Sequence, residues 1–159
     1  MTDPMQALNG LQTALDAGAV RLQPCDVHRD LMVLLDHPTG TPRFTYALMA
    51  GRLVQAIALF ALVQPHEGLQ CFQLGIAVIE KMRGQGIGSR VLQQSIGELR
   101  NGLSRTPMKE FYIEAVVSID NHPSNAIAKR LISDSPTNIT DAFSKEPALQ
   151  YLRKLKSGI

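Results

Sequence analysis

The segment Arg83-Gly84-Gln85-Gly86-Ile87-Gly88 separates an apolar run that ends at Val78-Ile79 from a helical pattern that continues to about Arg100. Three glycines at alternating positions indicate a backbone that passes close to another group or adopts dihedral angles closed to other residues. The helix that follows directs the free N–H groups of its first turn, and the positive end of its dipole, toward this loop. Such a loop suits a phosphate group. The structural alternative is a glycine-rich turn that only lets a strand and a helix pack together.

Spacing separates the phosphate-binding motifs that compete for this loop. A Walker A loop ends in Gly-Lys-Ser/Thr, which the segment lacks. The dinucleotide fingerprint needs a glycine at position 89, where the chain has Ser89. The segment instead resembles the Q/R-x-x-G-x-G/A signature of the GNAT superfamily of N-acetyltransferases, with Arg83, Gly86 and Gly88 at the defined positions. In that family the loop amides hold the pyrophosphate of acetyl-coenzyme A.

A second stretch extends the resemblance. Ile113-Glu114-Ala115, Asn121-x-x-Ser124 and Ala128-Lys129-Arg130-Leu131 are similar to the strand, loop and helix of the ribosomal-protein acetyltransferase branch of GNAT, in which the asparagine contacts coenzyme A. Together the two stretches place the resemblance over roughly residues 43–132.

Two features depart from the family pattern. Leu131-Ile132-Ser133 stands where the family commonly has Leu-Gly-Phe. Many members also carry a helix tyrosine that acts as general acid, but this chain has no tyrosine between Tyr112 and Tyr151, so that role stays unassigned. For Tyr151 we expect a strand residue whose hydroxyl points outward.

The resemblance implies an α/β (α+β) fold over residues 1–159 as a single domain. It implies a mixed, mostly antiparallel central sheet of six to seven strands flanked by about four helices, with a splay between the fourth and fifth strands. It also implies acetyl-coenzyme A as cosubstrate, without a metal. The residues that it assigns to this cosubstrate are Ile76, Val78, Arg83, Gly84, Gln85, Gly86, Ile87, Gly88, Ser89, Asn121 and Ser124.

Apolar spacing and turn residues predict the remaining elements. Asp3-Pro4 is a good helix entry and Gly18 a good helix end, with leucines at helical spacing between them. The predicted helices are 4–17, 26–35, one from the glycine loop to about 100 and one that ends at about 132; the predicted strands are 20–22, 43–48, 53–63, 69–79, 111–117 and, in the tail, 148–152.

The strand 69–79 is predicted to present Gln73, Gly75 and Ala77 on one face, because side chains alternate along a strand. Gly75 within this apolar run indicates a bulge or a close backbone approach. The resemblance implies that the strand splays from its parallel neighbour and that its amides, near Ile76 to Val78, bind the pantetheine arm and polarise the thioester carbonyl.

The implied reaction is direct transfer of the acetyl group to an amine. A primary alkylamine has a pKa of about 10, so a group must accept its proton, directly or through water. Glu114 is the candidate base because a carboxylate within a buried strand costs free energy unless it is paired, hydrated or lines a cavity. Gln73 could orient a water, and Tyr112 shares the Glu114 face. A structural carboxylate, or one that binds the positive charge of the acceptor, stays open.

Composition bounds the other classes of function. The mean hydropathy is −0.01, and no apolar run approaches the roughly 20 residues of a membrane span. Since Met1–Pro4 also lack a signal-peptide pattern, we expect a cytoplasmic protein. A net charge of +2 gives no reason to expect nucleic-acid or membrane partners. Neither the two cysteines nor the four histidines have the spacing of a metal site. The expected partners are a small-molecule or peptide amine and, across exposed sheet edges, a homodimer.

Two other classes of function stay open on the sequence. The same pocket could sense acyl-coenzyme A without turnover, which the missing tyrosine and missing Gly-Phe allow. The glycine loop could also bind a different phosphate ligand.

Overall fold

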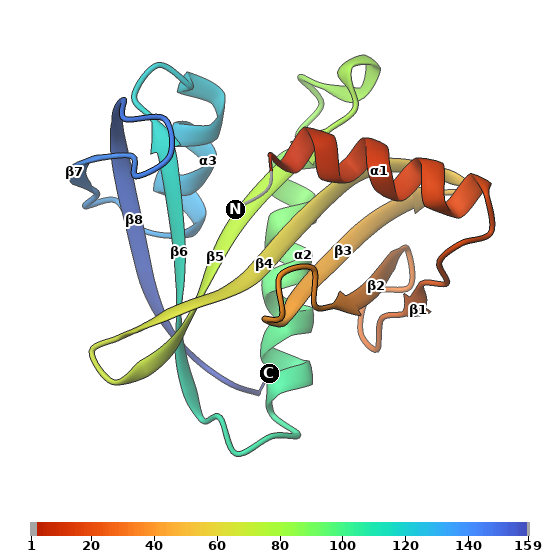
Figure 1. Ribbon diagram of the computed structural model, residues 1–159, viewed down its shortest axis with the longest axis horizontal. Coiled ribbons are helices and arrows are strands. Elements are labelled where there is room, and N and C mark those ends of the chain that lie inside the picture. The colour runs from red at the N-terminus through yellow and green to blue at the C-terminus, as the bar shows by residue number, and fades with distance from the viewer. Residues whose placement is uncertain (1–2, 159) are drawn as a thin grey trace.

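The computed structural model describes residues 3–158, so Met1 and Thr2, which entered the expectation about the start of the chain, lie outside it. Its centre is an eight-stranded sheet with the strand order β1-β2-β3-β4-β5-β6-β8-β7 (Figure 1). Every neighbouring pair is antiparallel except β5 and β6, which the helix α2 connects. The strands are β1 (Gln23–Pro24), β2 (Leu31–Asp36), β3 (Arg43–Ala50), β4 (Leu53–His66), β5 (Leu69–Val78), β6 (Glu110–Ser118), β7 (Thr137–Thr140) and β8 (Pro147–Lys156). The helices are α1 (Pro4–Asp16), the short 3-10 helix η1 (Glu80–Met82), α2 (Ile87–Leu103) and α3 (His122–Leu131).

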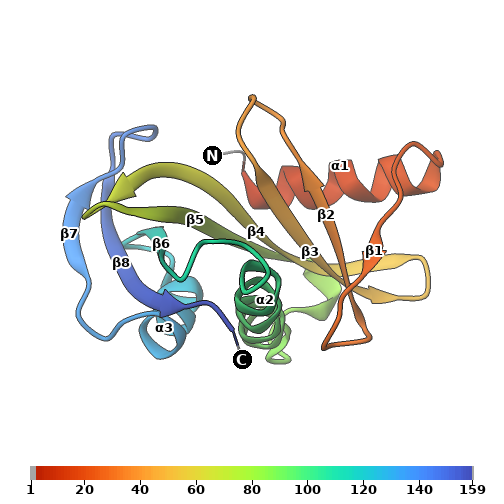
Figure 2. The ribbon, with the colours of Figure 1, turned by 90° about the horizontal axis from the view of Figure 1, so that it is seen from below.

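Helices cover both faces of the sheet, with α2 and α3 on one face and α1 on the other (Figure 2). The alternation predicted along β5 explains this layering. Phe72 and Leu74 join the core cluster under α2 and α3, whereas Ala77 joins the smaller cluster under α1. Burial of apolar side chains on both faces stabilises the sheet by roughly 25 cal/mol per Å² removed from water.

The ends of α1 follow from its sequence. Asp3 Oδ1 accepts a hydrogen bond from the Met5 N–H at 3.2 Å, and Pro4 occupies the first helical position. After the C-cap residue Ala17, Gly18 adopts φ +68°, which ends the helix as predicted.

The sheet divides between β5 and β6. These strands pair only at Cys71–Tyr112, Phe72–Ile113 and Gln73–Glu114. Beyond that point β5 continues to Val78 and β6 to Ser118 without pairing with each other, so the sheet opens into two diverging arms. The predicted splay is present. It lies between the fifth and sixth strands rather than the fourth and fifth, because β2, which was predicted as a helix, adds one strand before it.

The prediction of a helix over 26–35 is wrong. Residues 31–36 form β2 and pair with β3, while the turn before them gives its backbone N–H groups to the carboxylate of Glu98. That side-chain partner satisfies the donors without a helix. Together with β7 (Thr137–Thr140), which was not predicted either, β2 gives the described sheet eight strands instead of six to seven, and three α-helices flank it instead of about four.

Three further predictions can be compared with the structure. The strand predicted at 20–22 is displaced to Gln23–Pro24, because Leu22 is buried under α1 instead. Of the two alternatives predicted at Gly75, a bulge or a close backbone approach, the bulge is absent, since the β4–β5 pairing runs through Leu59–Gly75 without a shift. The tail strand 148–152 is confirmed as part of β8, although β7, which pairs with it, was not predicted. Within residues 3–158, no helix has both the length and the apolar character needed to cross a bilayer.

Candidate cofactor and acceptor site

A cavity of about 840 Å³ fills the opening between the arms of β5 and β6. Its walls come from both layers of the fold. The arms contribute residues 74–78 and 115–118, and the first residues of α1, α2 and α3 complete the wall. The N-terminal ends of all three helices, the positive ends of their dipoles, therefore lie at the wall of one cavity.

The three helix N-termini differ in how they are capped. Asp3 caps α1, and Asn121 Oδ1 accepts a hydrogen bond from the Ser124 N–H at 3.2 Å to cap α3. The N-cap of α2 is Gly86, which has no side chain to offer. The first turn of α2 thus keeps N–H groups that can donate hydrogen bonds to a ligand. It also contains no acidic residue that would repel an anion.

The glycines of the loop serve different purposes. Gly84 and Gly86 adopt φ +76° and +77°, left-handed angles that favour glycine. A Cβ added at either position would meet no other atom within 4 Å, so their surroundings are open. Gly88 is buried, and a Cβ there would lie 3.2 Å from Ile127 Cδ1, so this glycine permits close packing of α2 against α3.

Arg83 is held beside the loop by contacts to two elements. Its Nε donates to the Val78 carbonyl at 3.0 Å, and its Nη2 lies 3.7 Å from Met5 Sδ. Arg83 and Asp3 are the charged side chains among the described residues of the cavity wall. The guanidinium is a cation that a phosphate can approach.

Ten of the eleven residues that the sequence assigned to the cosubstrate line this cavity. The exception is Gln85, which is exposed and whose Nε2 donates to the Lys81 carbonyl at 3.5 Å. Sequence reasoning missed the contribution of residues 3–5. Nothing in their sequence signals it, because the topology alone brings the start of α1 to a loop some 80 residues later.

Glu114 belongs to the last residue pair of the β5–β6 ladder, where the two strands separate, and neither Glu114 nor Gln73 is among the residues that line the cavity. Its Oε1 accepts from Gln73 Nε2 at 3.1 Å, and its Oε2 accepts from Gln150 Nε2 at 2.7 Å. The structure thus brings the two predicted catalytic residues together and adds Gln150 from β8, which sequence reasoning missed. Tyr112 is not part of this group, because its hydroxyl donates to Glu67 at 2.9 Å. That hydrogen bond raises the pKa of Tyr112.

Tyr151 does not point its hydroxyl outward, contrary to the sequence prediction. The side chain is buried, and the hydroxyl donates to Asn125 Oδ1 at 2.8 Å. Burial raises the pKa of Tyr151, so the hydroxyl stays protonated as a donor. Asn125 Nδ2 in turn donates to the carbonyls of Ser118 and Asn121, at 2.9 and 3.0 Å. This network braces the loop between β6 and α3 that forms one wall of the cavity.

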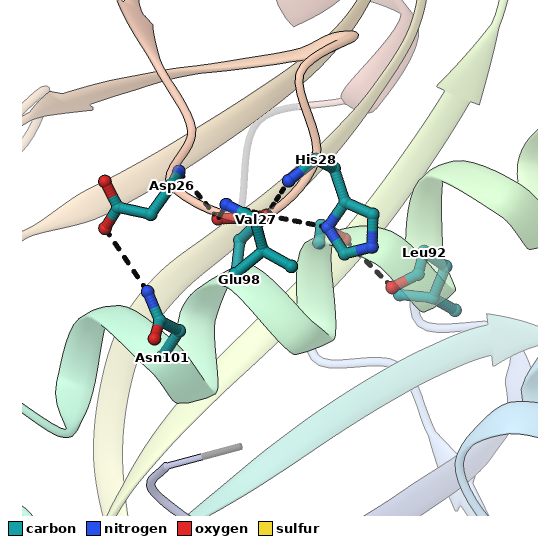
Figure 3. Close-up of polar contacts among 7 residues, drawn as sticks. Asp26, Val27, His28, Leu92, Glu98 and Asn101 are labelled. Carbon is teal, nitrogen blue, oxygen red and sulfur yellow. Dashed lines mark hydrogen bonds and ion pairs between the residues drawn. The ribbon is translucent and has the colours of Figure 1, made fainter.

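A second polar cluster fastens the turn before β2 to α2 (Figure 3). The carboxylate of Glu98 is buried and accepts from the backbone N–H groups of Asp26, Val27 and His28 at 2.6 to 3.2 Å. His28 Nδ1 lies 2.6 Å from Glu98 Oε2. Asn101 Nδ2, one turn farther along α2, donates to the Asp26 carboxylate at 3.2 Å.

The thiols do not form a nucleophilic site at neutral pH. Burial raises the pKa of Cys25 to about 12 and that of Cys71 to about 11, so both stay protonated. Within residues 3–158, no group of three histidine, cysteine or acidic side chains is arranged to hold a metal ion.

Comparison with known proteins places this geometry in a recognised architecture. No family model matches the chain. No curated protein matches it by sequence either. Solved structures do match by fold. RimL, a ribosomal-protein α-N-acetyltransferase in complex with coenzyme A, aligns with a TM-score of 0.56 and 21% identity, over 77% of this chain and 67% of that one.

Two other solved structures show the same likeness. A ribosomal-protein-alanine N-acetyltransferase from Brucella melitensis has a TM-score of 0.51 and 20% identity, over 73% of this chain and 70% of its own. A spermidine N-acetyltransferase chimera that includes the Vibrio cholerae protein has a TM-score of 0.51 and 10% identity, over 74% and 68%. The chain therefore has the GNAT fold.

Proposed function

We propose, from this fold and the cavity that it encloses, that the chain is an acetyl-coenzyme A-dependent N-acetyltransferase that transfers the acetyl group directly to a primary amine. The observation that carries the proposal is the N-terminus of α2, which opens into the cavity without a side-chain cap. The left-handed glycines beside it leave the space that a diphosphate would need.

In this proposal the loop from Arg83 to Ser89 holds the diphosphate of acetyl-coenzyme A through its backbone N–H groups. The pantetheine arm lies along the free edge of β5, with Asn121 and Ser124 on the opposite wall. A backbone N–H near Ile76 to Val78 donates to the thioester oxygen, where negative charge develops during transfer.

Two protons must leave the acceptor nitrogen during transfer. The acceptor arrives as an ammonium ion and loses one proton to the Glu114 carboxylate, directly or through water. The nitrogen lone pair forms the C–N bond as the C–S bond breaks, and coenzyme A leaves as a thiolate. That thiolate takes up the second proton of the nitrogen. The hydroxyls of Ser118 and Ser124, two residues of the cavity wall, donate hydrogen bonds that stabilise the thiolate until it takes up this proton, and they transfer no proton themselves.

The first experiment identifies the ligand. Acetyl-coenzyme A is expected to raise the melting temperature of the protein, because a ligand that binds only the folded state stabilises it by about 2.7 kcal/mol at 100 times its Kd. ATP and NAD at equal concentration serve as controls and are expected to leave the melting temperature unchanged. A shift with ATP or NAD alone would contradict the proposal and indicate a different phosphate ligand.

A second measurement separates an enzyme from a sensor. Thiol release is followed while acetyl-coenzyme A is incubated with alkylamines, polyamines and N-terminal peptides. Release that depends on the acceptor supports transfer. Binding of acetyl-coenzyme A without release from any acceptor would instead favour a non-catalytic acyl-coenzyme A sensor with the same fold.

Tyr151→Phe tests the bracing of the cavity wall. Because the hydroxyl of Tyr151 holds Asn125, its removal is expected to weaken acetyl-coenzyme A binding by about three- to tenfold, corresponding to a net hydrogen bond of about 1 kcal/mol. Isothermal titration calorimetry measures this change. Tyr112→Phe, which removes a hydroxyl bonded to Glu67, is the matched control and should leave the affinity unchanged. Equal affinities for both variants would show that the network does not support the ligand.

A further inference from the structure

We propose that Gln150 and Gln73 are positioning residues that hold the Glu114 carboxylate between them, ready to receive the acceptor's ammonium group. This inference rests on the proposed function. We name the three side chains Gln73, Glu114 and Gln150 the amide clamp. It contains one group, Gln150, that neither the sequence motifs nor the resemblance indicated.

The clamp spans three adjacent strands. Gln73 on β5 pairs directly with Glu114 on β6, and Gln150 on β8 pairs with Val116, two residues farther along β6. Alternation places all three side chains on the face opposite α2 and α3. Each carboxylate oxygen receives one amide N–H, at 3.1 Å from Gln73 and 2.7 Å from Gln150. The carboxylate is consequently fixed from both sides at the point where β5 and β6 separate.

The charge of the clamp is unbalanced. Among residues 3–158, no lysine, arginine or histidine forms an ion pair with Glu114. The amides are neutral, so they stabilise the ionised carboxylate without cancelling its charge. A partly buried carboxylate in this state favours a cationic partner, and the ammonium form of an alkylamine is the acceptor class that supplies one.

The other ionisable groups on this face do not pair with Glu114, so its carboxylate stays available to a cationic acceptor. Cys71 on β5 is held neutral by its raised pKa. Glu67, in the turn after β4, accepts a hydrogen bond from the hydroxyl of Tyr112, and His66 at the end of β4 packs edge-to-face against the ring of Tyr112. Lys154 on β8 pairs with Glu110 on β6 at 3.4 Å. Within the described chain, these groups are therefore occupied with one another or uncharged.

Gln150→Leu tests the clamp through the pH dependence of turnover. The rate falls on the acid side when the carboxylate is protonated. Loss of an amide donor destabilises the ionised form, so the acid limb of kcat/KM for the amine is expected to move to higher pH. At neutral pH, kcat/KM should fall about tenfold, whereas the Kd of acetyl-coenzyme A should stay within twofold. Gln93→Leu, the same change at an exposed position on α2, is the control and should alter neither quantity.

A second readout needs no turnover. In ¹⁵N-labelled protein, the side-chain amide resonance of Gln150 is expected to shift as Glu114 is protonated at acidic pH, and Glu114→Gln should abolish this shift. A pH-independent Gln150 resonance, or a working enzyme whose acid limb is unchanged in Gln150→Leu, overturns the inference while leaving the proposed function intact. Absence of acetyl-coenzyme A binding in the unaltered protein overturns the proposed function itself, and the resonance then still decides whether the clamp exists.

Discussion

Gly86→Leu is expected to weaken acetyl-coenzyme A binding at least about a hundredfold, equivalent to about 2.7 kcal/mol. Gly86 adopts φ +77°, where a residue with a Cβ is strained by roughly 1–2 kcal/mol. The new side chain would also enter the open space before the first turn of α2, where the diphosphate is proposed to lie. Calorimetric titration with acetyl-coenzyme A measures the loss.

The control must share the backbone strain without touching the cavity. Gly40, in the turn between β2 and β3, has φ +86° and equally open surroundings, so Gly40→Leu should cost similar stability and leave the affinity unchanged. Unfolding curves of both variants show whether each is folded under the conditions of the titration. A folded Gly86→Leu variant with unchanged affinity would refute the placement of the diphosphate.

Glu98→Ala is expected to lower the free energy of unfolding by about 3–5 kcal/mol. The substitution removes the acceptor of three backbone N–H groups and of His28 Nδ1, all in the turn that packs on α2. Those donors would have to find water or stay unsatisfied. Urea denaturation followed by circular dichroism measures the change.

Two further variants are compared with Glu98→Ala for their loss of unfolding free energy. Glu98→Gln keeps the shape but has one acceptor oxygen in place of two, so an intermediate loss is expected. Glu110→Ala removes a half-exposed carboxylate that pairs with Lys154 and should cost less than about 1 kcal/mol. If Glu98→Ala were no more harmful than Glu110→Ala, the turn would not depend on this carboxylate.

Local signals were sufficient to predict much of the fold. The cap at Asp3, the stop at Gly18 and the alternation along β5 are each encoded within a few residues, and the structure has the corresponding elements. The glycine loop was likewise predictable, because left-handed angles and an uncapped helix start need residues of that kind in that order.

The errors arose where a distant partner decides the local structure. Residues 26–28 have a composition that suits a helix, but the carboxylate that satisfies their N–H groups lies some 70 residues away on α2. Gln150 was missed for the same reason, since only the β6–β8 pairing brings it to Glu114. The start of α1 also reaches the cavity through topology rather than through any local motif.

The position of Arg83 between the end of β5 and Met5 on α1 has a consequence for cooperativity. A molecule bound in the cavity would touch α1 from one layer of the protein and α2 and α3 from the other. Neither α1 on one face nor α2 and α3 on the other could then separate from the sheet before that molecule dissociates. Occupancy would therefore join two packing units, which share only the sheet, into one unit that unfolds in a single step.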